Sequence, residues 1–224
     1  MNGAESLTKA LAKEGVKVCF TNPGTSEMHL VNALDSEAGI RSILCLFEGV
    51  CTGAADGYGR MTGKPAATLL HLGPGLANGI SNLHNARKAS TPIINLVGDH
   101  ADYHRKYDSP LNSDITALAS NVSSWIKSDS TAMSLSSDVI EALNSAIKPK
   151  PRPDGQISTL IIPANAAWEK GTDAVKSSEL RERGQVSKRK IDEIKSLDLV
   201  SITFMSLFID FEYLKPVSYT HLTL

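Results

Sequence analysis

The feature that most constrains this fold is an alternation between short apolar runs and helical periods over the first 165 residues. Apolar runs predict strands at residues 16–20, 40–47, 66–71, 92–97, 122–127 and 158–162. Apolar residues at helical spacing predict helices at residues 3–13, 26–34, 49–61, 73–88, 114–119 and 136–147. Continuously apolar strands separated by helices are typical of a parallel sheet. We therefore predict an α/β fold, with a parallel sheet covered by helices on both faces.

Turn and capping residues support these boundaries. Gly15 ends the first predicted helix, and Asn22-Pro23-Gly24 is a turn signal after the first strand. Ser26 has the side chain of a helix N-cap. Residues 148–155 are rich in proline and predict a surface loop.

Charge and composition exclude several classes of partner. The 224 residues include 23 Lys and Arg against 24 Asp and Glu, and only 5% are aromatic. This balance gives no basic surface for nucleic acid or an anionic membrane, and few rings for stacking bases. The apolar stretch at residues 199–211 is too short and too polar to span a bilayer, and residues 1–14 lack a signal-peptide pattern. We expect a cytoplasmic protein that binds neither nucleic acid nor membrane.

The cysteines and histidines do not predict a metal centre. The three cysteines lie in separate apolar stretches, which favours buried free thiols. His100 and His104 have the spacing of one helical face, as metal ligands can. The surrounding residues 99–110 have the composition of a loop, so a polar surface loop is the favoured interpretation. We expect no metal ligands in this chain.

The junctions where strands end carry the candidate functional residues, because ligands of open parallel sheets bind at the carboxyl ends of the strands. Glu48 directly follows the second apolar run. Poor solvation there favours a neutral carboxyl group that can share a proton with a ring nitrogen. The alternative is a structural acid that stabilises the start of the next helix.

Another strand-to-helix junction combines His71, Gly73-Pro74-Gly75 and Asn78. The backbone N–H groups of this loop are a weak candidate for anion binding, and a tight turn that permits close packing is the alternative. His71 ends its strand in the same layer as Glu48. It is either a functional group or a structural histidine.

Together these junctions resemble one family. Its motifs appear here as Asn22-Pro23-Gly24, Glu48-Gly49, Ala54-Ala55-Asp56-Gly57-Tyr58-Gly59-Arg60, Thr62-Gly63-Lys64-Pro65, His71, Gly73-Pro74-Gly75, Asn78 and Ser90-Thr91-Pro92-Ile93-Ile94. They resemble the pyrimidine-binding (PYR) domain of thiamine-diphosphate-dependent enzymes of the acetolactate synthase and pyruvate oxidase group. His71 and the Asn22-Pro23-Gly24 turn also resemble benzoylformate decarboxylase.

The resemblance implies roles for individual residues. Glu48 would hydrogen-bond the aminopyrimidine ring of thiamine diphosphate and promote loss of the thiazolium proton, and His71 would be a second catalytic group. Thr25 and His71 would lie on the side of a small 2-oxo acid substrate. The residues expected to bind the cofactor are Asn22, Pro23, Gly24, Glu48, Gly73 and Asn78.

The resemblance also implies a longer protein. Residues 1–170 match the PYR domain, residues 171–196 form a charged linker with one helix at 188–195, and residues 197–224 form an atypical tail. The family's Gly-Asp-Gly motif for Mg²⁺ and diphosphate is not found, so Mg²⁺ would bind through a domain absent from this chain. The domain that would decide FAD binding is also missing. The last eight residues resemble a translated sequencing adapter, which favours an out-of-frame tail over a variable linker.

The functional expectation is therefore an N-terminal fragment of an acetolactate synthase-like carboligase, inactive by itself. The full-length protein would be a homodimer or homotetramer, because family members build their sites between two chains. A 2-oxo acid decarboxylase of the benzoylformate type is the first alternative, and a non-catalytic partner-binding domain is the second. A nucleotide-binding domain is disfavoured, because no glycine-rich fingerprint follows the first strand.

Overall fold

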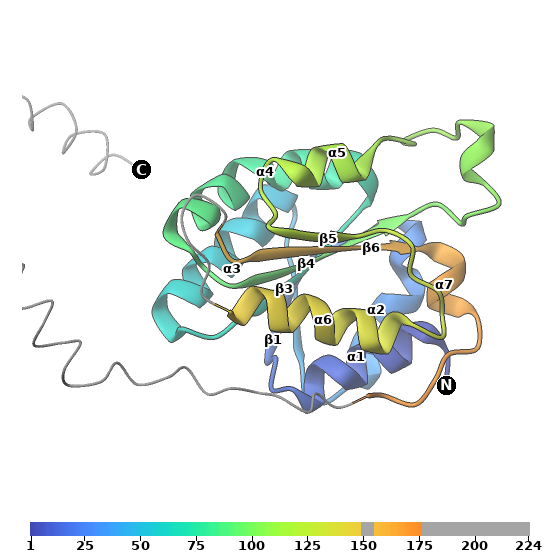
Figure 1. Ribbon diagram of the computed structural model, residues 1–224, viewed down its shortest axis with the longest axis horizontal. Coiled ribbons are helices and arrows are strands. Elements are labelled where there is room, and N and C mark those ends of the chain that lie inside the picture. The colour runs from blue at the N-terminus through green and yellow to red at the C-terminus, as the bar shows by residue number, and fades with distance from the viewer. Residues whose placement is uncertain (149–154, 176–224) are drawn as a thin grey trace, which may run out of the picture. The chain divides into compact units, whose positions relative to one another are not determined.

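A single parallel sheet organises the computed structural model, which describes residues 1–148 and 155–175 (Figure 1). Its strands stand in the order β2-β1-β3-β4-β6-β5, and all neighbouring pairs are parallel. The register places Thr21 beside Leu69, and Leu69 beside Leu96. The strand bounds are β1 (Val18–Asn22), β2 (Arg41–Leu44), β3 (Ala66–Leu70), β4 (Ile93–Asp99), β5 (Trp125–Lys127) and β6 (Ile157–Pro163).

Helices cover both faces of the sheet, which confirms the predicted fold class (Figure 1). One apolar core joins the sheet to α1 (Gly3–Lys13), α2 (Met28–Ser36), α6 (Leu135–Ile147) and α7 (Ala164–Trp168). A second core joins the other face to α3 (Glu48–Thr62), α4 (Leu72–Ala89) and α5 (Ile115–Ser120). Leu7 and Leu11 on α1 are fully buried, as the helical spacing of apolar residues predicts.

The second strand differs from the prediction. A buried strand was predicted at residues 40–47, but β2 is a four-residue edge strand, Arg41–Leu44. Leu44 at its end is 69% exposed, and of the residues that follow, Leu46 is 92% and Phe47 49% exposed, whereas Cys45 is buried. An apolar run looks the same in sequence whether its side chains are buried or exposed, so the pattern alone predicted burial.

The predicted N-cap at Ser26 is wrong. A 3-10 turn, η1 (Thr25–Glu27), precedes α2, and the Glu27 carboxylate accepts the Gly24 N–H at 2.7 Å. The cap is therefore the Glu27 carboxylate, which accepts the Gly24 N–H as in a capping box, and not a serine hydroxyl.

Close packing of α3 against α4 positions the start of both helices. A Cβ atom on Gly79 would lie 2.8 Å from Thr52 Cγ2, so only glycine permits this approach. The Thr52 hydroxyl donates to the Gly79 carbonyl at 3.0 Å, and Asn82 Nδ2 donates to the Gly49 carbonyl at 2.7 Å. The small residues of these helices thus serve an internal contact.

The second half of the family motif lies at the far end of α3. Asp56 accepts from the Thr91 hydroxyl at 2.7 Å and pairs with Arg60 at 2.8 Å. Gly63, with φ of 67°, ends the helix in the left-handed conformation that glycine favours. Because Thr91 precedes β4, these contacts fasten α3 to the amino end of the sheet. The motif residues Asp56 and Arg60 therefore serve the fold.

All three cysteines are buried and free, as predicted. Burial raises the pKa of Cys19 to about 12 and also raises the pKa of Cys51. Both thiols therefore remain protonated at neutral pH.

Residues 171–175 lie against the first and sixth helices. Lys13 Nζ donates to the Ala174 carbonyl at 3.1 Å, and the Val175 N–H donates to Ser136 Oγ at 2.7 Å. The predicted helix at residues 188–195, the apolar stretch at 199–211, the tail at 197–224 and most of the proline-rich loop lie outside the described residues. None of the helices in the described ranges has both the length and the apolar character needed to cross a bilayer.

Candidate functional site

Three strand-to-helix junctions meet at the carboxyl edge of the sheet. β1 leads into η1, β2 leads through residues 45–47 into α3, and β3 leads through His71 into α4. Because β2, β1 and β3 are neighbours and parallel, their carboxyl ends stand side by side. This brings together the groups predicted at separate points of the sequence.

Glu48 is the first residue of α3, and it is buried, with 8% of its surface exposed. Its Oε2 atom accepts a hydrogen bond from Asn78 Nδ2 at 3.0 Å. The helix dipole of α3 favours the negative charge here, so the predicted structural role is present as well. Asn78, predicted to bind a cofactor, thus reaches the site by contacting Glu48.

Gly75 lies between the two predicted catalytic residues. A Cβ atom built on it would stand 3.2 Å from Glu48 Oε1 and 3.5 Å from His71 Cβ. The bare backbone of Gly75 therefore leaves room beside the Glu48 carboxylate. For Gly73, which the sequence predicts to bind the cofactor, an added Cβ atom would meet Ser113 and Leu118.

The first turn of α4 is strained next to His71. Leu72 has φ of 54°, a left-handed conformation that is unusual for a residue with a side chain. Such a residue costs on the order of 1–3 kcal/mol, and strain of this kind clusters at functional sites. His71 is the N-cap of α4 and makes no side-chain cap hydrogen bond.

The His71 side chain instead pairs with Glu27, a residue that the sequence analysis missed. Nδ1 of His71 lies 2.8 Å from Glu27 Oε2. The Glu27 side chain is fully buried, whereas 24% of the His71 side chain is exposed. Burial raises the pKa of Glu27, while the Gly24 N–H and His71 act in the opposite direction. Glutamate three residues after a helix-capping glycine was the signal that could have found it.

The turn residues Asn22, Pro23 and Gly24 are all partly exposed at this edge. Gly24 is the most constrained of them, because a Cβ atom there would lie 2.6 Å from His71 Cγ and collide with the imidazole ring. The predicted turn therefore packs against the imidazole ring of His71 through Gly24.

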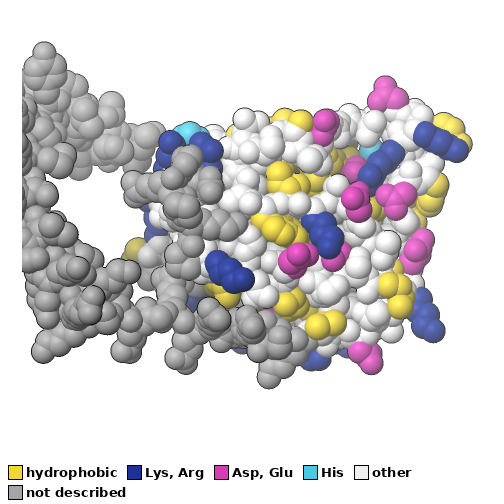
Figure 2. Space-filling model, in the orientation of Figure 1, with side chains coloured by type: hydrophobic (Ala, Val, Ile, Leu, Met, Phe, Trp, Pro, Cys, Tyr) yellow, Lys and Arg dark blue, Asp and Glu magenta, His cyan; other side chains and the backbone are white. Residues whose placement is uncertain are grey.

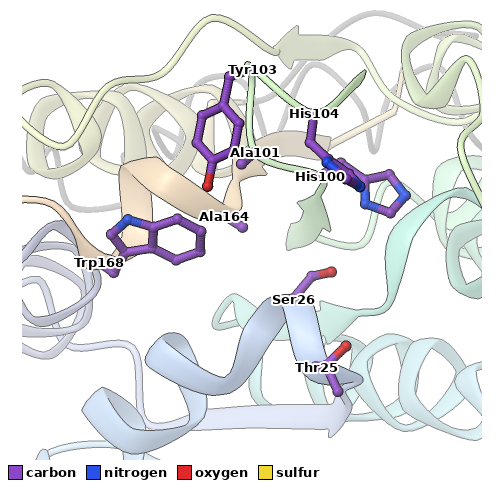
Figure 3. Close-up of a pocket in the computed structure, with 8 residues that line it drawn as sticks. All are labelled: Thr25, Ser26, His100, Ala101, Tyr103, His104, Ala164 and Trp168. Atoms are coloured by element: carbon purple, nitrogen blue, oxygen red, sulfur yellow. The ribbon is translucent and has the colours of Figure 1, made fainter. Parts of the chain in front are cut away.

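Thr25, predicted to contact substrate, lines a pocket of about 240 Å³ on the β4 side of this edge. Figure 3 shows Thr25 and Ser26 on one wall, with Trp168 and Tyr103 toward the other. Neither Glu48 nor His71 lines it. The lining residues are Thr25, Ser26, His100, Ala101, Tyr103, His104, Ala164 and Trp168.

His100 and His104 lie in a loop, as favoured by the sequence. His100 Nε2 is 3.2 Å from the Pro110 carbonyl, and His104 precedes the 3-10 turn η2 (Arg105–Tyr107). Arg105 pairs with Asp99 at 3.0 Å. On the face seen in Figure 2, acidic and basic side chains are interspersed, so neither sign forms a continuous patch among the coloured residues.

Comparisons with known proteins show the family to which the chain belongs. Residues 1–120 match the family described as "Thiamine pyrophosphate enzyme, N-terminal TPP binding domain". The chain is 54% identical over 174 residues to "Putative acetolactate synthase large subunit IlvX" of Mycobacterium tuberculosis, covering 78% of this chain and 33% of that protein. It is 32% identical over 119 residues to the acetolactate synthase large subunit of Buchnera aphidicola from Acyrthosiphon pisum, covering 53% and 21%.

A solved structure has the same fold. The thiamine diphosphate-dependent 4-hydroxybenzoylformate decarboxylase of Rhodococcus jostii matches with a TM-score of 0.74 and 20% identity, covering 87% of this chain and 36% of that one. The chain thus spans about a third of the length of its M. tuberculosis relative and of this structure. The match over more than half of its residues shows that the chain belongs to the thiamine pyrophosphate enzymes, as their N-terminal TPP-binding domain.

Proposed function

We propose that the chain is the PYR domain of a thiamine-diphosphate-dependent 2-oxo acid carboligase of the acetolactate synthase type. The observation that carries the proposal is Glu48, a buried carboxylate at the carboxyl edge of the sheet, held by Asn78 through only one of its oxygens. The similarity to acetolactate synthase large subunits supports the choice of reaction.

The residues around Glu48 fit a cofactor ring. Among the described residues, no protein group donates to Glu48 Oε1. Gly75, which has no side chain, leaves space beside this atom. A carboxylate oxygen beside such a space can hydrogen-bond a ring nitrogen. Gly24 and Asn22-Pro23 form the neighbouring part of the same edge.

The protein groups have separable tasks in this proposal. Thiamine diphosphate, when bound, supplies an electron sink for the carbonyl carbon of a 2-oxo acid. Glu48 holds and exchanges a proton at Oε1, while the Asn78 amide fixes the orientation of its carboxylate. His71 moves a proton on the substrate side, and Thr25 contacts the substrate. Mg²⁺ and the diphosphate group bind to a domain outside this chain.

A second copy of the protein is the proposed partner. Four apolar side chains are exposed from the last residue of β2 to the first turn of α3: Leu44, Leu46, Phe47 and Val50. Exposed apolar groups of this density mark interaction surfaces. Covering them in a homodimer or homotetramer would bury the start of α3, and with it Glu48, between two chains.

The experiment is product analysis with the protein that contains this chain together with the diphosphate-binding domain. Incubation with pyruvate, thiamine diphosphate and Mg²⁺ should give acetolactate, and Glu48→Gln should abolish most of it. A protein that binds thiamine diphosphate without consuming pyruvate or another 2-oxo acid would contradict the proposal.

A decarboxylase is the second candidate, and the His71–Glu27 pair is the observation that favours it. A histidine at the substrate side can return a proton to the carbon left by CO₂. Acetaldehyde from pyruvate, or an aldehyde from an aromatic 2-oxo acid, would identify this reaction in the same assay.

A further inference from the structure

We propose that Glu27 is a positioning residue that fixes His71 as the Nδ1–H tautomer, so that Nε2 is left as the proton acceptor. Its use in turnover rests on the proposed function, but the tautomer itself does not. The proposal gives Glu27, a fully buried residue, a task beyond capping the turn at Gly24.

The hydrogen-bond pattern at Glu27 sets the direction of the His71 contact. Oε2 accepts the Gly24 N–H at 2.7 Å, and the same oxygen lies 2.8 Å from His71 Nδ1. A carboxylate oxygen accepts two hydrogen bonds, and an ionised carboxylate has no proton to give. The second bond is therefore donated by Nδ1–H. In a neutral imidazole this leaves the lone pair on Nε2.

The arrangement goes beyond what capping alone requires. Glu27 Oε1 is buried and makes no hydrogen bond within the described part of the chain. An unpaired buried carboxylate oxygen costs free energy that a smaller capping side chain would avoid. The cost is understandable if the charge serves the imidazole, because a carboxylate next to the ring stabilises the protonated form that appears during proton transfer.

Two glycines lie against this pair, one against each side chain. The imidazole ring lies against Gly24, where any side chain would collide with it. The Glu27 carboxyl group lies against Gly98 near the end of β4, where a Cβ atom would collide with Oε1. The pair therefore spans the carboxyl ends of β1, β3 and β4, which are adjacent strands.

The test is nitrogen NMR of the imidazole rings in the full 224-residue chain at alkaline pH, where histidine is neutral. Nitrogen shifts distinguish the two tautomers directly. His71→Asn assigns the signal among the six histidines. We expect His71 to be the Nδ1–H tautomer, and we expect Glu27→Ala to lose this preference in favour of Nε2–H, because Nδ1 then faces no carboxylate acceptor.

Glu5→Ala is the matched control. Glu5 closes the same type of capping box at α1, where it accepts the Asn2 N–H at 3.0 Å, and its hydrogen bond is not to a histidine. This variant should leave the His71 tautomer unchanged. Wild-type His71 found as Nε2–H would overturn the proposal without any variant, so a failure of Glu27→Ala to fold does not matter.

Turnover separates this inference from the proposed function. In the longer protein, Glu27→Ala should lower kcat at least about tenfold with little change in KM, since a proton-transfer group would be misdirected. Wild-type kcat in a Glu27→Ala protein with a switched tautomer would overturn the positioning role. A wild-type protein that consumes no 2-oxo acid while His71 is Nδ1–H would instead contradict the proposed function alone.

Discussion

Two buried polar clusters in this molecule differ in how completely their hydrogen bonds are made. In the middle of the sheet, the Thr68 hydroxyl donates to Asn95 Oδ1 at 2.8 Å, and Asn95 Nδ2 donates to Thr159 Oγ1 at 3.1 Å. Ser123 Oγ extends the row at 2.7 Å from Thr159 Oγ1. At the carboxyl edge, Glu27 and Glu48 each use only one oxygen in the hydrogen bonds described above.

This difference distinguishes polar groups that stabilise the fold from polar groups that are available to a ligand. A satisfied polar row inside a sheet specifies strand neighbours and leaves nothing for a ligand. The edge cluster combines two incompletely bonded carboxylates, a partly exposed histidine and a strained Leu72. Groups kept in such states against a free-energy cost are typical of sites that act on something else. Removing them should change function, whereas removing the row should change stability.

The largest expected effect is on the activity of residues 1–224 alone. This chain should show no measurable thiamine-diphosphate-dependent consumption of 2-oxo acids, because the proposed function places Mg²⁺ and the diphosphate group on a domain outside it. The exposed Leu46 and Phe47 should produce dimers or aggregates on a sizing column. Calorimetry that finds micromolar cofactor binding to a clean monomer would contradict this expectation.

His71→Ala should have the next largest effect. In the longer protein we expect turnover to fall roughly 10²-fold, the lower end of what a positioned proton-transfer group contributes, with cofactor affinity changed only a few-fold. Steady-state kinetics and a cofactor titration measure both. A loss of several kcal/mol of stability with normal activity per folded molecule would make His71 a structural residue.

Asn95→Leu should produce the opposite pattern. It leaves the Thr68 hydroxyl without its acceptor inside the sheet, so the free energy of unfolding should fall by about 1–3 kcal/mol. Denaturant unfolding of the 224-residue chain checks this. Asn112→Ala is the control, because Asn112 is exposed and its bond to Asp108 should contribute less than about 0.5 kcal/mol. Equal stability of both variants would contradict the claim that the polar row inside the sheet stabilises the fold.

Alanine substitutions at two glycines of the α3–α4 pair should change stability in opposite directions, and Gly57→Ala should have the smallest effect. Gly79→Ala places a methyl group 2.8 Å from Thr52 Cγ2 and should destabilise by about 1–3 kcal/mol. Gly57→Ala meets nothing within 4 Å on an exposed part of the same helix pair, so it should stabilise by about 0.5–1 kcal/mol. Thermal unfolding of both variants measures the difference, and shifts of the same sign would contradict the packing described.

The sequence was most informative about the interior of the fold. The apolar runs around Ile94 and Leu160 are buried strands, because a parallel sheet covered on both faces needs continuous apolar strands. The order of the strands was not predicted, since apolar patterns do not state which strand lies next to which. The run that includes Leu44 was misassigned because its exposed side chains lack a cover among the described residues.

The sequence named part of this edge cluster. Glu48 and His71 were singled out because one follows and the other ends a predicted strand, and Asn78 because it follows the loop Gly73-Pro74-Gly75. Glu27 was missed because it was considered only as part of a helix start, and Gly75 because the loop Gly73-Pro74-Gly75 was treated as one unit. Both act through contacts with residues more than 25 positions away, which no local pattern contains.

The most direct test of the account is the turnover of Glu48→Gln in the longer protein at saturating thiamine diphosphate, measured together with its unfolding temperature. The swap keeps the shape of the side chain and removes its ability to hold a proton. We predict a loss of about 10²- to 10⁴-fold in turnover, about 3–5 kcal/mol of barrier, with little change in stability. Wild-type turnover under these conditions would contradict the central claim that Glu48 is the group that acts on the cofactor.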